Sequence, residues 1–226
     1  MATNPIICAI DSHDFDESIS LISEIHNHVH AIKLGLEFFM AFGINGVKSI
    51  ISQFPKIKIF LDLKFHDIPN TVCGALKSLV NIENIFLTTI HASGGEEMIK
   101  EAVKIAKDSQ NLKIICVTKL TSLELKVEEI SNLAKISLIN GAHGIVCPAN
   151  AIHKIKQDLS QDFPNFIIVT PGIRIENNNI NNDDQKSVST PKNAMKNGAT
   201  YLVIGRPITQ SANKIETING ILNHLS

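Results

Sequence analysis

The sequence predicts one closed barrel of eight parallel strands, in which a helix follows each strand. Short apolar runs rich in β-branched residues recur along the whole chain, and segments with helical spacing of apolar residues lie between them. Eight units share the 226 residues, which leaves about 28 for each strand, helix and pair of short loops. Chains of this length often form a single such barrel, so we expect one domain spanning residues 1–226.

The predicted strands are nearly continuous apolar runs, as expected of parallel strands that are covered on both faces. An open doubly wound sheet is the alternative, but it usually has fewer strands and a glycine-rich turn after the first one. Here the first run leads into Asp11, Ser12 and His13, with no glycine. The predicted strands are Ile6–Ile10, Ala31–Leu34, Ile57–Leu63, Ile85–His91, Lys113–Thr118, His143–Cys147, Phe166–Thr170 and Tyr201–Gly205.

The predicted helices are marked by apolar residues three or four positions apart. One polar stretch, residues 176–184 with the sequence ENNNINNDD, is too polar to pack, so we expect a surface insertion or a mobile lid there. The clearest helical patterns are Ile19, Ile22, Ile25 and Val29, then Ile44, Val47, Ile50 and Ile51, then Met98, Ile99, Ala102 and Val103, and finally Ile215, Ile218, Ile221 and Leu222.

Composition excludes several classes of protein. The 21 Lys and Arg against 22 Asp and Glu leave a formal charge of −1, without the basic excess that nucleic acid binding needs. No apolar run approaches the roughly 18 to 20 residues of a membrane span, and no basic residue precedes the first short apolar stretch. Four widely spaced cysteines, three of them within apolar runs, indicate buried thiols in a reducing compartment and hence a cytoplasmic protein. They are Cys8, Cys73, Cys116 and Cys147.

Polar residues that close the predicted strands are the first candidates for a functional site, because barrels of this kind bind ligands at the carboxyl ends of their strands. Two of them are Arg174 and Arg206, the only arginines, so 19 of the 21 basic residues are lysine. Each follows a glycine turn at the end of strand seven or eight, where barrels commonly bind phosphate, and a guanidinium grips phosphate through two parallel hydrogen bonds. The alternative is a structural role in capping carbonyls or bridging helices.

The third predicted strand carries a second signal. Asp62 and Lys64 are two positions apart, so on an extended strand both point toward the barrel axis, and Lys33 on the neighbouring strand can reach the same place. Burying such charges is costly unless they pair. They form either a structural ion-pair layer or a preorganised array with ammonium groups aimed where negative charge develops, and their place at the strand ends favours the second.

Three further groups are weaker candidates. His26, His28 and His30 are spread around a helix end, so we expect solvated surface histidines and no metal site. His91, which ends strand four, is a general base or a hydrogen-bonded supporting residue. Cys73 lies in an apolar helix and is expected to pack.

Several segments together resemble the orotidine 5'-phosphate decarboxylase family, over essentially the whole chain. The most specific is the run from Asp62 to Thr71, DLKFHDIPNT. The others are Asp11, Lys33-Leu34-Gly35, Val117-Thr118-Lys119-Leu120-Thr121-Ser122, Thr170-Pro171-Gly172-Ile173-Arg174, Asp184-Gln185 and Ile204-Gly205-Arg206-Pro207-Ile208.

The resemblance implies a barrel without cofactor or metal that converts orotidine 5'-monophosphate to UMP and carbon dioxide. It assigns Lys33, Asp62, Lys64 and Asp67 to a charged tetrad in which Lys64 is the proton donor and Asp62 faces the leaving carboxylate. It also implies a homodimer, with Asp67 contributed across the interface to the neighbouring site.

The resemblance also assigns the substrate contacts. Asp11 and Lys33 would hold the ribose hydroxyls, Thr71 of the neighbouring chain would border the same site, and Thr121 or Ser122 would contact the pyrimidine.

On the phosphate side, Gln185, Gly205 and Arg206 would hold the phosphate, with Arg174 at the base of a closing loop from Pro171 to Pro191.

Two other functions remain possible. Related sugar-phosphate barrels share the Asp-x-Lys-x-x-Asp motif but use Mg²⁺ to stabilise an enediolate, and they need a carboxylate where this chain has Lys33, a cation with no lone pair. A phosphate-binding barrel without catalytic activity would keep Arg206 but would not need alternating Lys and Asp residues at the barrel mouth.

Overall fold

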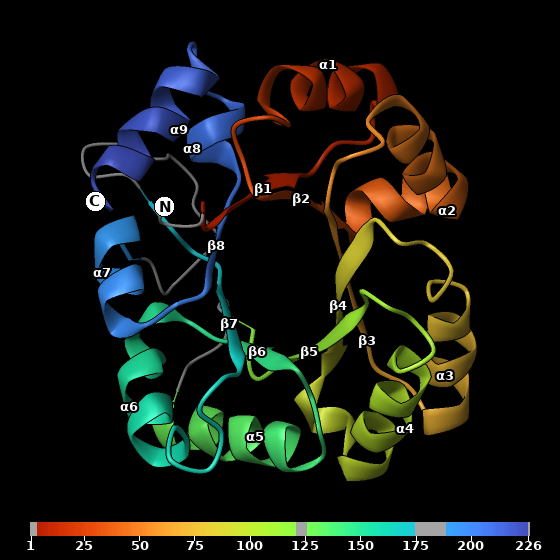
Figure 1. The fold of residues 1–226 in the computed structure, drawn as a ribbon, viewed down its shortest axis with the longest axis vertical. Coiled ribbons are helices and arrows are strands. Elements are labelled where there is room, and N and C mark those ends of the chain that lie inside the picture. Colours follow the sequence, from red (N-terminus) through yellow and green to blue (C-terminus); the bar gives the residue numbers. More distant parts are fainter. Residues whose placement is uncertain (1–3, 121–125, 175–188, 226) are drawn as a thin grey trace.

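The computed structural model describes residues 4–120, 126–174 and 189–225, and in that part of the chain the predicted barrel is confirmed. All neighbouring strands are parallel, and β1 pairs with both β2 and β8, which closes the sheet (Figure 1). The strands are β1 (Ile6–Ile10), β2 (Ala31–Gly35), β3 (Ile59–Phe65), β4 (Ile85–His91), β5 (Lys113–Val117), β6 (Gly144–Val146), β7 (Ile167–Thr170) and β8 (Tyr201–Ile204).

The helices form a ring around the outside of the barrel (Figure 1). Ile22 and Ile25 of the first predicted pattern are buried in α1, whereas Val29 lies beyond the end of that helix. The helices are α1 (Phe15–Ile25), α2 (Leu36–Gln53), α3 (Pro69–Lys77), α4 (Glu96–Ala106), α5 (Val127–Ile139), α6 (Ala149–Leu159), α7 (Pro191–Asn197), α8 (Arg206–Thr209) and α9 (Lys214–Asn223), with a 3₁₀ turn η1 (Ala92–Gly94) after β4.

Six of the eight strands differ from the sequence prediction by one or two residues at one or both ends, and the differences in the third and sixth strands have a visible cause. The third strand begins at Ile59 instead of Ile57, because Ile57 closes a turn by donating its backbone N–H to the carbonyl of Phe54. The sixth strand is only Gly144–Val146, and a Cβ on Gly144 would lie 2.2 Å from the carbonyl oxygen of Ile167. Glycine is needed at that point, since β6 and β7 approach too closely for any side chain.

Apolar side chains fill two layers, as expected for parallel strands that face helices on one side and the barrel axis on the other. The larger layer lies between strands and helices and includes Ile6, Phe38 and Leu61. The smaller layer fills the barrel interior, where Ile7, Ala31, Phe60, Leu87, Ile115 and Val169 are buried.

The cysteines follow the sequence prediction. All four are free and buried, and burial raises the pKa of Cys8, Cys116 and Cys147 to about 12. In the part of the chain that the structure describes, no helix is long and apolar enough to cross a bilayer.

Candidate active site

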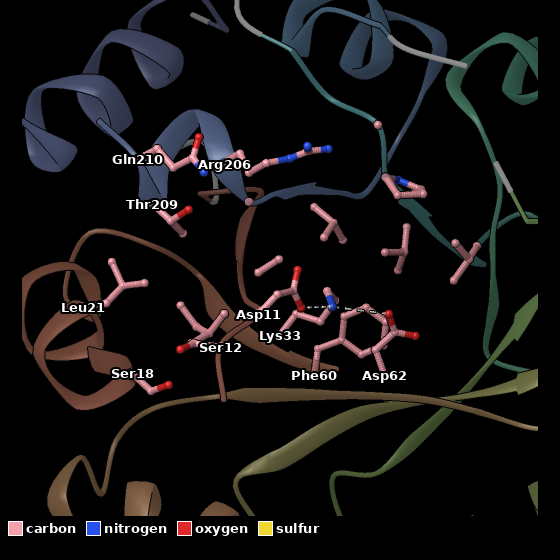
Figure 2. A pocket seen from close by; sticks show the side chains of 18 of the residues that line it. Asp11, Ser12, Ser18, Leu21, Lys33, Phe60, Asp62, Arg206, Thr209 and Gln210 are labelled. Carbon is pink, nitrogen blue, oxygen red and sulfur yellow. Dashed lines mark hydrogen bonds and ion pairs between the residues drawn. The ribbon is translucent and has the colours of Figure 1, made fainter. Parts of the chain in front are cut away.

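A cavity of about 900 Å³ opens at the carboxyl ends of the strands (Figure 2). Its floor is apolar and comes from the barrel interior, with Phe60, Val117, Val146, Val169 and Val203 among the lining residues. Its walls carry most of the polar residues that the sequence singled out, namely Asp11, Lys33, Asp62, Lys64, Arg174, Gly205 and Arg206. These positions therefore line one cavity, and the roles that the sequence assigns to them stay predictions.

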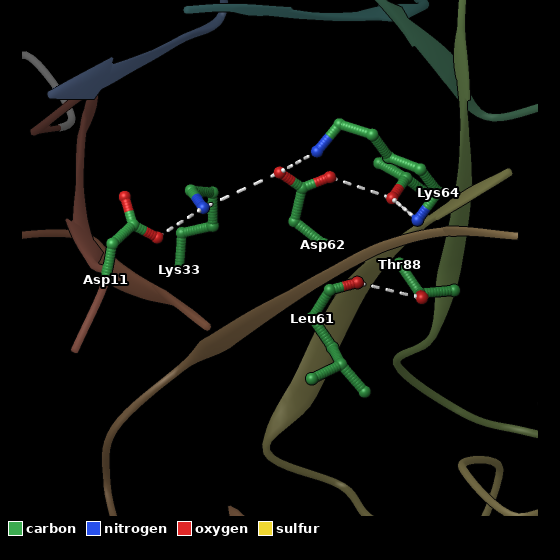
Figure 3. A network of polar contacts seen from close by, with 7 residues as sticks. Asp11, Lys33, Leu61, Asp62, Lys64 and Thr88 are labelled. Atoms are coloured by element: carbon green, nitrogen blue, oxygen red, sulfur yellow. Dashed lines mark hydrogen bonds and ion pairs between the residues drawn. The ribbon is translucent and has the colours of Figure 1, made fainter. Parts of the chain in front are cut away.

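Four charged side chains of alternating sign cross one side of this cavity (Figure 3). Lys33 Nζ lies 3.2 Å from Asp11 Oδ1 and 3.6 Å from Asp62 Oδ2. Lys64 Nζ donates a hydrogen bond of 2.8 Å to the same Oδ2. Because three successive β strands contribute these groups, the alternating row, which we call the charged ladder, is held by the sheet itself.

Pairing keeps the inner members of the charged ladder ionised despite their burial. For Lys33, burial favours the neutral amine, but attraction to Asp62 and then to Asp11 outweighs it, so its pKa lies above the usual value. For Asp62, burial favours the neutral acid, but Lys33 and Lys64 outweigh it and its pKa lies below the usual range. Lys33 and Asp62 are therefore held in their charged forms.

The backbone at Lys64 departs from the regular geometry of a β strand. Its φ of 50° is the only positive φ of a non-glycine residue that the structure describes. The pairing with β4 shifts register here, since Leu61 pairs with Thr88 and Phe65 with Ile90. The predicted meeting of Asp62 and Lys64 is correct, but it depends on this irregularity and not on the simple alternation of an extended strand. A strained backbone of this kind often marks a functional position.

Thr89 holds this irregular segment, and sequence reasoning missed it. Its Oγ1 accepts a 2.9 Å hydrogen bond from the backbone N–H of Lys64 and donates one of 2.9 Å to Asp62 Oδ1. The neighbouring Thr88 instead donates to the carbonyl of Leu61 at 2.9 Å. Two adjacent hydroxyls inside a largely apolar strand were the available signal, because a buried hydroxyl needs a partner.

Gly35 leaves room for the outer end of the charged ladder. A Cβ at this position would lie 2.9 Å from Lys33 Nζ and 3.2 Å from Asp11 Oδ1. Any larger residue would therefore push the ammonium and the carboxylate aside, which explains the glycine in the Lys33-Leu34-Gly35 segment.

The two arginines line the same cavity from the ends of β7 and β8, and β8 is the strand that pairs with β1. Arg206 begins α8 directly after Gly205, and Figure 2 shows it above the charged ladder. Arg174 follows β7, where its backbone N–H donates to the carbonyl of Ser189 and its side chain donates to the carbonyl of Ile173 at 3.0 Å. Both residues line the cavity, and their contact with a phosphate stays a prediction.

Some predicted site residues lie elsewhere in the chain. Asp67 is exposed, and its carboxylate accepts a hydrogen bond of 2.7 Å from the backbone N–H of Ile68, with no contact to the charged ladder of its own chain. Thr71 is exposed in the first turns of α3 and does not line the cavity. The predicted contacts Thr121, Ser122 and Gln185 lie outside the described residues.

The candidate histidines behave differently from one another. His91 lies against His66 with ring centroids 5.2 Å apart, and burial, followed by the charges of His66 and Lys64, lowers its pKa. The expectation of a solvated His30 is wrong, because its ring packs against Phe86 and Tyr201 at the amino end of the barrel. Among the described residues, no group of three or more His, Cys, Asp or Glu side chains could hold a metal ion.

Fold and site together define a (β/α)8 barrel whose carboxyl mouth carries a fixed Lys/Asp array and two arginines. Residues 4–221 match the family described as the orotidine 5'-phosphate decarboxylase / HUMPS family. The chain belongs to this family.

Two similar proteins and one solved structure are named orotidine 5'-phosphate decarboxylase. The protein from Wolbachia pipientis subsp. Culex pipiens is 42% identical, with 99% of each chain covered. The protein from Ehrlichia chaffeensis is 40% identical, with 100% of this chain and 99% of that protein covered. The crystal structure of the Lactobacillus acidophilus enzyme superposes with a TM-score of 0.82 at 32% identity, covering 99% of both chains.

Proposed function

We propose that the protein decarboxylates orotidine 5'-monophosphate to UMP and carbon dioxide, a step of pyrimidine nucleotide synthesis. The observation that carries the proposal is the charged ladder, in which Lys64 pairs with Asp62 in a cavity that the two arginines also line. Family membership supports the same reaction.

Decarboxylation of this substrate requires fixed charges near the reacting carbon. Loss of carbon dioxide from C6 of the pyrimidine leaves the electron pair of the broken bond on a ring carbon, with no adjacent carbonyl in conjugation to accept it. Stabilisation must then be electrostatic, from charges that are already in place before the reaction. The Lys64 ammonium supplies the positive charge and then transfers a proton to C6, after which the amine regains a proton from solvent.

Rigidity of Lys64 is as important as its charge. Asp62 fixes its ammonium, and Thr89 fixes its backbone N–H. Electrostatic stabilisation is most effective when the charges do not have to reorganise during the reaction. The charged ladder and the hydroxyl of Thr89 thus meet the requirement of a preorganised site.

Arg206 binds the end of the substrate that does not react. It lines the cavity at the carboxyl end of β8, where barrels commonly hold phosphate. Binding energy from this remote group can position the pyrimidine against Lys64, which is how contacts far from the reacting carbon raise the rate of chemistry.

A homodimer with shared sites is part of the proposal. Asp67 does not reach its own ladder, and the large apolar side chains near it are exposed, with Leu36 at 52%, Met40 at 79% and Ile68 at 66%. Leu36 and Met40 begin α2 and Ile68 precedes α3, so all three lie after neighbouring strands, at the carboxyl end of the barrel. Apolar side chains at this exposure are typical of a protein interface, and a partner seated here would bring its own Asp67 toward the cavity.

The reaction is tested by following the fall in ultraviolet absorbance as purified protein consumes orotidine 5'-monophosphate, with Lys64→Ala as the control. Turnover by the wild type and none by the variant are expected. A wild type without turnover, or a variant as active as the wild type, contradicts the proposal. Loss of wild-type activity on addition of a chelator would favour the Mg²⁺-dependent reaction instead.

The shared site is tested by mixing two inactive variants, Lys64→Ala and Asp67→Ala, under conditions that exchange subunits. If each site combines Lys64 of one chain with Asp67 of the other, each mixed dimer regains one complete site, and about a quarter of wild-type activity returns in an equal mixture. No recovery despite subunit exchange, or an active monomer in sedimentation at dilute concentration, contradicts a shared site.

The four buried, unpaired thiols support a reducing compartment, so we place the enzyme in the cytoplasm. A fusion of the protein with a fluorescent reporter, expressed in its host, should show diffuse cytoplasmic signal. Signal confined to another compartment contradicts this assignment.

A further inference from the structure

The cavity extends beyond the barrel mouth, into a region that the proposed substrate contacts leave unused. This region, which we call the side lobe, lies between α1 on one wall and α8 with the start of α9 on the other (Figure 2). It borders the predicted phosphate site, since Arg206 begins the short helix that ends at the lobe residue Thr209. The side lobe is lined by Glu17, Ser20, Leu21, Glu24, Thr209, Gln210 and Lys214.

The side lobe lies within reach of a longer phosphate chain. The backbone N–H of Gln210 donates to the carbonyl of Arg206 at 3.0 Å, so the two residues are one helical turn apart. One turn rises about 5.4 Å, a distance that one or two further phosphate groups can span. A nucleotide whose first phosphate is held at Arg206 can therefore place a second and a third phosphate against the walls of the side lobe.

The charges of the side lobe do not suit such a chain. Lys214 is the only Lys or Arg among the described residues that line the lobe, and its Nζ lies 3.0 Å from Glu24 Oε2. Glu17 is a second carboxylate, and Ser12 holds it by donating a 2.6 Å hydrogen bond to its Oε2. The other lining residues are neutral, so two carboxylates face one ammonium and the lobe has a net negative charge.

The pairing of Lys214 matters because proteins hold phosphate groups with Lys and Arg. The Lys214 side chain is 21% exposed and the Glu24 side chain 39%, so water screens this pair less than a fully exposed one. The ammonium is thus already neutralised by a neighbouring carboxylate, and a further anion would meet like charge. Placing like charges against an unwanted ligand is one way in which a binding site gains specificity.

We propose that Glu24, assisted by Glu17, is a specificity-determining residue that restricts the enzyme to nucleoside monophosphates. Glu24 occupies the ammonium of Lys214, and both carboxylates repel the additional negative charge of a nucleoside di- or triphosphate. This inference rests on the proposed function, because it takes Arg206 as the contact of the first phosphate.

The test measures the inhibition constants of UMP, UDP and UTP against orotidine 5'-monophosphate in the absorbance assay. Divalent metal ions are left out, so that the phosphate groups keep their full charge. In the wild type, we expect binding to weaken from UMP to UTP. In Glu24→Gln, the inhibition constant of UTP should fall about fivefold, the range of a partly exposed charge pair, while that of UMP changes little.

The matched control is Asp16→Asn. Asp16 is exposed in the first turn of the same helix and does not line the cavity, so this substitution removes an equal charge away from the side lobe. It should keep the wild-type ratio between the inhibition constants of UTP and UMP. Glu17→Gln should shift the ratio in the same direction as Glu24→Gln but less, because Lys214 stays paired.

Substitution of Lys214 tests the pair from the other side. Lys214→Met leaves two carboxylates without an opposing charge in the side lobe, so UTP should bind even more weakly than to the wild type. Combining Lys214→Met with Glu24→Gln restores the net charge of the wild-type lobe, and the double variant should return to about the wild-type ratio.

A wild type that binds UTP as tightly as UMP would overturn the inference, because the side lobe would then accept further phosphates. Equal ratios in Glu24→Gln and Asp16→Asn would also overturn it, as would an inhibition constant of UMP that falls as much as that of UTP. Calorimetric titration with the three nucleotides gives dissociation constants without turnover. Failure of the proposed function is recognised separately, because then the wild type neither consumes orotidine 5'-monophosphate nor binds UMP.

Discussion

At the amino mouth of the barrel, His30, Phe86 and Tyr201 pack ring against ring, whereas the carboxyl mouth holds four charged groups in a row. The three ring centroids lie 4.8 to 5.9 Å apart. Nε2 of His30 is buried and has no hydrogen-bond partner among the described residues. The same strands form both mouths. The contrast between an aromatic cluster and a charged row therefore comes from the side chains at the two ends of the strands.

Burial has opposite outcomes at the two mouths. At the amino mouth, burial lowers the pKa of His30, assisted by the nearby charge of Lys58, and raises the pKa of Tyr201, so both groups are kept neutral. At the carboxyl mouth, burial is outweighed by pairing, and Lys33 and Asp62 are kept charged. A buried titratable group is therefore a candidate for electrostatic catalysis only when an opposite charge accompanies it.

The largest expected effect comes from removing Lys64. Lys64→Ala should lower kcat by at least about a thousandfold, because it removes both the charge beside the developing carbanion and the proton donor. The absorbance assay measures the rate, and a near-ultraviolet circular dichroism spectrum verifies the fold. Lys77→Ala, at an exposed lysine in the last turn of α3, is the control and should match the wild type. A kcat of Lys64→Ala within tenfold of the wild-type value would contradict a catalytic role for the charged carboxyl mouth.

Arg206→Ala should come next. Loss of a charge-assisted phosphate contact is expected to raise KM about ten- to a hundredfold while kcat falls much less, because this side chain lies away from the reacting carbon. Steady-state kinetics over a wide substrate range separates the two parameters. An unchanged KM would mean that the phosphate binds elsewhere.

At the amino mouth, Phe86→Ala should affect stability and not chemistry. Truncating this half-buried ring is expected to cost about 2 kcal/mol of unfolding free energy, with kcat unchanged. Urea unfolding and the absorbance assay measure the two quantities on the same preparation. A fall in kcat of the folded variant would show that the two mouths are coupled.

Two neighbouring threonines of β4 sharpen the comparison within a single strand. Thr89→Val removes the hydroxyl that holds Asp62 and Lys64, so we expect kcat to fall about tenfold along with a stability loss of about 1 kcal/mol. Thr88→Val removes an equally buried hydroxyl that serves only the carbonyl of Leu61, and should lose similar stability with full kcat. Equal kcat values in the two variants would show that the Thr89 hydroxyl does not position Asp62 and Lys64 for catalysis.

The smallest effect concerns pH. Because the folded-state pKa of His30 lies below its ordinary value of 6.5, the unfolded chain binds a proton that the folded chain rejects. The stabilisation is complete above pH 6.5 and is lost as the pH falls toward the lowered folded pKa. His30→Phe keeps a ring but cannot titrate, so its unfolding free energy should change less between pH 7 and pH 5 than that of the wild type.

Urea unfolding at several pH values measures this slope, with His153→Gln at an exposed position of α6 as the control. His91 and His143, whose pKa values are also lowered by burial, contribute to the slope in both variants. An identical slope in His30→Phe and the wild type would show that His30 is not kept neutral by the fold.

Sequence predicted the barrel and most of the site because both follow from local signals. Continuous apolar runs fix the number of strands, and charged residues at their ends must meet at one mouth once the strands are parallel. Thr89 and the positive φ of Lys64 could not be predicted in the same way, since both depend on the register shift between β3 and β4. His30 was misjudged because its partners, Phe86 and Tyr201, are far away in sequence and become neighbours only when the barrel closes.

The charged ladder contains two cations and two anions, so Asp11, Lys33, Asp62 and Lys64 carry no net charge between them. At long range, such a neutral array produces almost no field that would attract a nucleotide with both a phosphate and a carboxylate. Arg174 and Arg206 add positive charge to the wall of the same cavity. Dissolved salt screens long-range attraction far more than contact between buried groups. Ionic strength should therefore change the association rate constant of the nucleotide strongly and the rate of the chemical step very little.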